Sequence, residues 1–136
     1  MSTAKVVKVP TDRVGARDYL NQARQFSKDS ETDVISSESK QVLIHQAAIS
    51  GCDAILLASG FRIRGSEGGH ELRLREALKR VAPDEEELLD DLLASRDRRS
   101  EASYAAEPVA RASVAEARDA LAQLLELAAS YLADTT

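Results

Sequence analysis

Asp53 is the only charged residue between Lys40 and Arg62. If the residues on both sides of Asp53 form a helix, apolar side chains cover nearly all of its faces. Such a helix is stable in water only when other elements cover it on most sides. The sequence therefore predicts a central helix over residues 37–59, ended by Gly60, on which the rest of the chain packs.

Other apolar residues recur at helical spacing and predict further helices around the central one. We expect these helices over residues 12–28, over residues 70–80, from Pro83 onward, and from the capping-box sequence Ser113–Glu116 to about residue 133. The glycine-rich residues 60–69 are expected to form a loop. The predicted fold is all-α, an up-and-down bundle of four to five helices, with a flexible segment over residues 1–11 and one domain over residues 12–133.

Small residues form a patch in the middle of the central helix: Ala47, Ala48, Gly51 and Cys52. A glycine inside a helix is destabilising by about 1 kcal/mol relative to alanine. Close approach of another helix would explain it, and that helix could belong to the same chain or to a second copy.

Composition excludes several classes of protein. With 136 residues the chain is long enough for one domain, and its single cysteine cannot form an internal disulfide. The first ten residues hold no sustained apolar segment, so we expect no signal peptide. No apolar run approaches the roughly 20 residues of a membrane span, so we expect no membrane partner and a cytoplasmic location. Cys52, His45 and His70 lie too far apart in sequence for metal-ligand spacing, so no metal or cofactor is expected.

Charge is distributed unevenly along the chain, whose formal net charge is −5. A local cationic cleft would be enough to bind phosphates on an acidic protein. The basic residues from Arg73 to Arg80 are interpreted as a solvated helix face.

The apolar stripe of the fourth predicted helix turns cationic near its end. The stripe consists of Leu88, Leu89, Leu92 and Leu93, and its extension by helical spacing reaches Arg96 and Arg99. An unpaired buried charge is strongly destabilising, so these arginines must extend their charged ends to solvent, pair with a carboxylate, or face a cleft or a subunit boundary. Asp53 is the matching anomaly on the central helix. A buried Asp53–Arg pair and a functional site that includes Asp53 are both consistent with the pattern.

The order of these segments resembles that of the HEPN superfamily. The segments that carry the resemblance are "ARDYLNQA", "LIHQAAISGCDAILLASG", "GGHELRLREAL", "SRDRRSEASY" and the Ala-rich last helix, which together span most of the chain. The family motif is an arginine followed, after four to six residues, by a histidine. Here Arg99, or Arg98, precedes Tyr104, which stands where that histidine would be.

The resemblance implies a metal-independent endoribonuclease or RNA-binding protein of toxin or defence type, acting at the cleft of a homodimer. Arg99 and Tyr104 would then be catalytic, and Arg96, Arg98 and His70 would bind the anion. The partners implied are RNA or a nucleotide, and an antitoxin or nucleotidyltransferase. The alternative is a catalytically inactive helical module that binds a nucleotide or a partner protein, with Tyr104 as a modification target.

Overall fold

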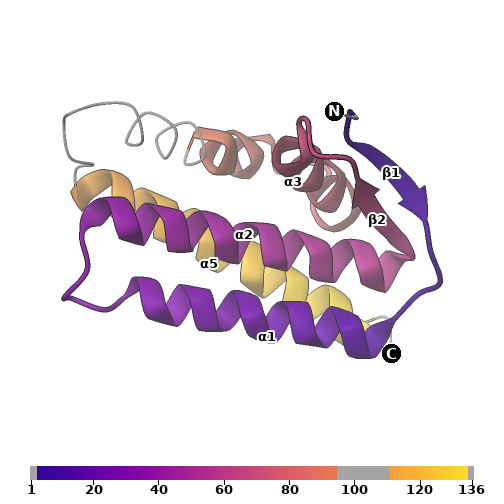
Figure 1. The fold of residues 1–136 in the computed structure, drawn as a ribbon, viewed down its shortest axis with the longest axis horizontal. Helices are drawn as coiled ribbons and strands as arrows, with labels where there is room; N and C mark the ends of the chain where they lie inside the picture. The colour runs from indigo at the N-terminus through magenta and orange to yellow at the C-terminus, as the bar shows by residue number, and fades with distance from the viewer. Residues whose placement is uncertain (1–2, 95–110, 135–136) are drawn as a thin grey trace.

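The computed structural model describes residues 3–94 and 111–134, and these are mostly helical (Figure 1). A fourth helical stretch covers residues 86–94 and lies between α3 and α5 in the chain. The named elements are β1 (Lys5–Lys8), α1 (Arg13–Ser30), α2 (Ser37–Ser59), β2 (Phe61–Arg64), α3 (Gly69–Val81) and α5 (Arg111–Asp134). The prediction of a helical bundle is confirmed in its coarse form, with a small two-stranded sheet added.

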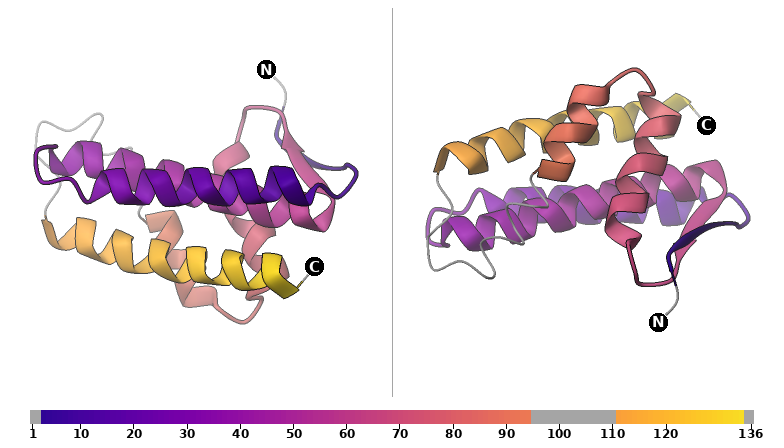
Figure 2. Two further views of the ribbon diagram at one scale, coloured as in Figure 1. Left: turned by 90° about the horizontal axis from the view of Figure 1, so that it is seen from below. Right: turned by 90° about the horizontal axis from the view of Figure 1, so that it is seen from above.

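The helix α2 is the centre of the structure, as its apolar sequence predicts. The helices α1 and α5 lie along it, while α3 runs across the long helices on another side (Figure 2). The first turn of α2 is capped by Ser36, whose side chain accepts a hydrogen bond from the Ser39 amide at 3.1 Å. Its end is formed by Gly60 in the left-handed conformation, with φ of 86°. The predicted bounds of this helix are therefore confirmed.

By length and composition alone, α2 is apolar enough to cross a membrane. The core helix of a globular domain has the same properties, and 61% of the most apolar window of α2 is buried inside the described structure. The covering helices account for its composition without a lipid phase.

The small-residue patch of α2 faces α5 of the same chain. A Cβ atom at Gly51 would lie 3.1 Å from Leu125 Cδ2 and 3.8 Å from Leu124 Cδ2. The shorter distance is tighter than an ordinary contact, so even a methyl group at this position would require Leu125 to shift. Of the two predicted sources of the partner helix, the structure shows the one within the chain.

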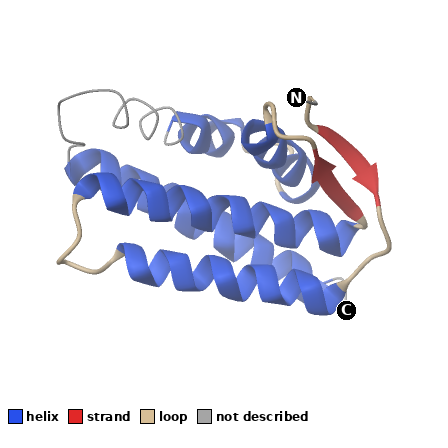
Figure 3. Ribbon diagram, viewed as in Figure 1, coloured by secondary structure: helices blue, strands red, loops and turns tan. Residues whose placement is uncertain are grey.

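The N-terminal residues differ from the predicted flexible segment. Residues Lys5–Lys8 form β1, which pairs antiparallel with β2, and Val6 lies opposite Ile63 (Figure 3). The Ala4 amide also donates to the Glu67 carbonyl at 2.8 Å. The predicted loop over residues 60–69 is likewise wrong at its start. Backbone pairing and the burial of Val6 and Ile63 against the helices explain both differences.

Two predicted helix starts also need correction. The helix α5 begins at Arg111, so Ser113 lies inside its first turn and is not the capping residue. Residues 83–84 form a turn, and the next helix begins at residue 86. Asp84 therefore lies before that helix.

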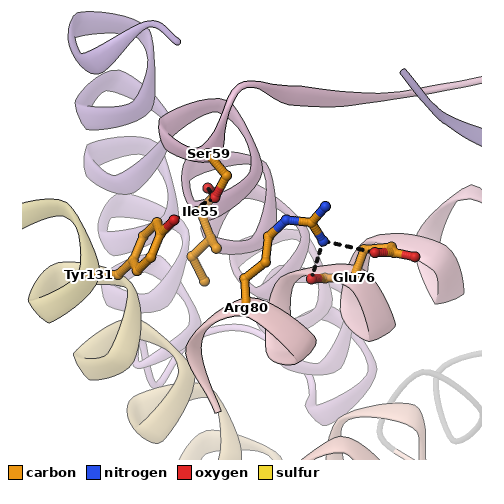
Figure 4. Close-up of polar contacts among 5 residues, drawn as sticks. All are labelled: Ile55, Ser59, Glu76, Arg80 and Tyr131. Atoms are coloured by element: carbon orange, nitrogen blue, oxygen red, sulfur yellow. Dashed lines mark hydrogen bonds and ion pairs between the residues drawn. The ribbon is translucent and has the colours of Figure 1, made fainter. Parts of the chain in front are cut away.

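Polar contacts connect the elements at the hairpin end of the bundle (Figure 4). The hydroxyls of Ser59 on α2 and Tyr131 on α5 share a hydrogen bond of 2.7 Å, and Ser59 also donates to the Ile55 carbonyl. Arg80 on α3 pairs with Glu76 at 2.8 Å, and its guanidinium lies 4.5 Å from the centre of the Phe61 ring on β2. These contacts fix α5 against α2 and α3 against the hairpin.

The close approach of α2 and α5 leads to a first prediction. Gly51→Val should lower the free energy of unfolding by about 2 kcal/mol, because the added methyl groups overlap the side chain of Leu125. Gln46→Val, at an exposed position of the same helix, is the control for the β-branched side chain itself. Urea unfolding of both variants measures the difference. Equal losses in the two variants would contradict the tight contact.

Candidate functional site

A cavity of about 530 Å³ lies where the first half of α1 meets the second half of α2, β2 and α3. Its lining mixes charged, aromatic and apolar side chains. The lining residues are Asp12, Gly15, Asp18, Tyr19, Gln22, Asp53, Leu57, Phe61, Arg62, Ile63 and Arg73. This volume is within the range of about 300–1,000 Å³ that is usual for small-molecule sites.

Asp53 and Arg73 form an ion pair in this cavity. Arg73 Nε donates to Asp53 Oδ1 at 2.9 Å, and each side chain is 21% exposed. The predicted Asp53–Arg pair is thus present, but it is partly rather than fully buried, and its arginine comes from α3. Arg73 lies four residues before Ala77, which is fully buried, and this helical phase turns it toward α2. The interpretation of Arg73 as part of a solvated face is therefore wrong.

The surroundings of Asp53 alter its acidity. Burial raises the pKa of its carboxyl group above the ordinary 3.8, although the charges of Arg73 and Arg62 and the hydrogen bond from Arg73 lower it. Desolvation dominates because the carboxylate sits among apolar side chains of α2. The neighbouring Cys52 is fully buried, and burial raises the pKa of its thiol, which keeps it protonated and unreactive.

Two further charges line the cavity without an ion-pair partner among the described residues. Asp18, on α1, and Arg62, on β2, are both exposed and come from different elements. Asp12 is engaged, since its Oδ1 accepts the Gly15 amide at 2.8 Å as the cap of α1. The sequence singled out Asp53 but gave no reason to connect it with α1, because that contact depends on the packing of the helices.

His70 lies beside the other histidine. Its Nδ1 shares a hydrogen bond of 2.9 Å with Nε2 of His45, which is buried in α2 while His70 is exposed. Of the predicted anion-binding residues, His70 is the only one within the described residues, and the contact joins α3 to α2. Among residues 3–94 and 111–134, no three His, Cys, Asp or Glu side chains come together as metal ligands.

The outer face of the hairpin is cationic. The strand register places Lys5 opposite Arg64 and Val7 opposite Arg62, on the side away from Val6 and Ile63. Lys5, Arg62 and Arg64, which we call the hairpin cations, are exposed, and none has an ion-pair partner in the described part of the chain. Arg62 belongs to both surfaces, since it also lines the cavity.

The motif residues predicted from the family resemblance lie outside the described residues. These are Arg96, Arg98, Arg99 and Tyr104. Their roles remain expectations from the sequence.

Comparisons of the chain with protein-family models, with curated proteins and with solved structures give no match.

The buried pair leads to a second prediction. Arg73→Gln should lower the free energy of unfolding by about 1–3 kcal/mol at pH 7, because it leaves the Asp53 carboxylate without its partner. The loss should be smaller at pH 4, where more of Asp53 is protonated and needs no cation. Arg75→Gln is the control, because its pair with Glu71 on the same helix is largely exposed. A loss that is equal at both pH values would contradict this account.

A third prediction concerns Asp53 alone. Its pKa is raised in the folded protein, so above pH 3.8 the folded state holds its proton longer than the unfolded state does. The stability that Asp53 contributes should therefore fall as the pH rises through this window. The difference in unfolding free energy between the wild type and Asp53→Asn, measured by urea unfolding from pH 4 to pH 7, should decrease accordingly. A difference in unfolding free energy that grows with pH would contradict a raised pKa of Asp53 in the folded protein.

Proposed function

We propose that this chain is a HEPN-like RNA-binding protein that acts as a homodimer, and that its motif region cleaves RNA. The order of helices in the described residues is compatible with the resemblance that the sequence carries. The observation that carries the proposal is the unpaired charge of the hairpin cations on a protein whose net charge is −5.

The arrangement of these cations favours a polyanionic partner. Like charges directly opposite each other on paired strands destabilise the sheet, and Lys5 faces Arg64 in this way. A phosphate between them would relieve the repulsion. Phosphates of a nucleic-acid backbone, spaced along the strand, also supply the electrostatic part of RNA affinity without any need for base recognition.

The chemistry proposed for the motif region follows the family resemblance. A 2′-hydroxyl loses its proton to a general base and its oxygen attacks the adjacent phosphorus. The bond from phosphorus to the 5′-oxygen of the next nucleotide breaks, which leaves a 2′,3′-cyclic phosphate and a 5′-hydroxyl that takes up a proton. A fixed arginine stabilises the charge that develops on the phosphate. Arg99 is assigned this role, with Arg96 and Arg98 holding the neighbouring phosphates. Tyr104 stands at the position of the general base, and it requires a pKa well below the usual value of about 10 to serve at neutral pH.

RNA retardation tests the binding part of the proposal. Lys5→Gln with Arg64→Gln should weaken the retardation of single-stranded RNA and lower the salt dependence of binding by about 0.7 units of log–log slope per lost contact. Arg17→Gln with Arg24→Gln, at exposed positions on α1, is the matched control and should bind as the wild type does. Equal weakening in the two double variants would remove the hairpin from the interface.

Cleavage is tested separately. Wild-type protein should degrade single-stranded RNA in the presence of a chelator, and Arg99→Ala should reduce the rate by about 100-fold or more, because it removes one stabilising group of the transition state. Arg24→Ala should leave the rate unchanged. Retention of RNA without any cleavage would favour the alternative, an inactive binding module.

A further inference from the structure

The cavity beside Asp53 carries an inference about a different ligand, whose site shares only Arg62 with the hairpin cations. We propose that it is a binding site for a zwitterionic amino acid with a large apolar side chain. The ammonium group would pair with Asp18, the carboxylate with Arg62, and the side chain would lie over Leu57 and Phe61.

The charges of the cavity define two ends for the ligand. Asp18 on α1 and Arg62 on β2 line one cavity from different elements, and both lack an ion-pair partner among the described residues. Their opposite signs suit a molecule that carries one positive and one negative group. Charge-assisted hydrogen bonds of this kind are stronger than neutral ones, so both ends contribute to affinity.

The net charge of the cavity lining argues against a mononucleotide as the ligand. Three carboxylates and two guanidinium groups line the cavity, so its formal charge is negative. Arg73, one of the two cations, is already committed to Asp53. A mononucleotide would bring a doubly charged phosphate into this field, with only Arg62 available to meet it, whereas a zwitterion adds no net charge.

The uncharged residues that line the cavity indicate what kind of side chain the amino-acid ligand has. Leu57, Phe61 and Ile63 supply apolar surface, and Tyr19 adds an aromatic ring. A volume of about 530 Å³ leaves space beyond the two charged ends. Burial of a large apolar side chain there adds to affinity in proportion to the apolar area removed from water, and glycine or alanine has too little of that area.

Calorimetric titration of the full chain with leucine and phenylalanine tests the proposal. At least one of them should bind, glycine should not, and N-acetylphenylalanine and phenylalaninamide, which each lack one charge, should bind at least about tenfold more weakly than phenylalanine. Binding of blocked and free amino acids with equal affinity, preferential binding of AMP or GMP, or no binding of any of these ligands would overturn the proposal.

Two variants test the assigned side chains. Asp18→Asn and Arg62→Gln should each weaken amino-acid binding at least about tenfold, while Asp33→Asn and Arg24→Gln, at exposed positions outside the cavity, should not change it. Thermal unfolding of each variant verifies that it is folded. Asp18 is not a hairpin cation, so Asp18→Asn should leave RNA retardation intact. Unchanged amino-acid affinity in Asp18→Asn would overturn the site, whatever the outcome with RNA.

Discussion

The need to cover α2 on nearly all sides determines the rest of this structure. Its side chains include some of the largest fully buried ones, Ile44, Ile55 and Leu56, and three other helices supply their apolar faces to them. Burial of this surface is the main favourable contribution to folding. The helix α5 reaches it at a glycine, α1 along much of its length, and α3 across it.

Asp53 is the one charged residue in the apolar part of this helix, beyond Lys40, and it changes what can cover the helix nearby. A half-buried carboxylate must keep a cation within hydrogen-bonding distance, and Arg73 fills that role from α3. The ion pair thus orients α3 relative to α2. Both side chains of the pair also line the cavity.

The helices could be predicted because their apolar spacing and end caps are local features of the sequence. The hairpin and the partner of Asp53 could not, because both depend on residues far apart in the chain. The cap residues Asp12, Ser36 and Gly60 act within one turn, so the ends of α1 and α2 could be read closely from the sequence. Each strand of the hairpin has only four residues, which is too short for a reliable alternating pattern, and neither strand is stable without the other. Asp53 stood out because its neighbours are apolar. Its partner did not, because several arginines satisfied the same requirement and only the packing of α3 selects among them.

The hairpin has one more consequence for the wall of the cavity. The Val9 amide donates to the Gly60 carbonyl at 2.9 Å, and the Asp12 amide lies 3.4 Å from the Leu57 carbonyl, so the entry to α1 is held against the exit from α2. At their other ends the same two helices are joined by the short connection over residues 31–36. The antiparallel pair is thereby braced at both extremities. A ligand in the cavity would contact a wall that is already ordered, so binding would cost little conformational entropy.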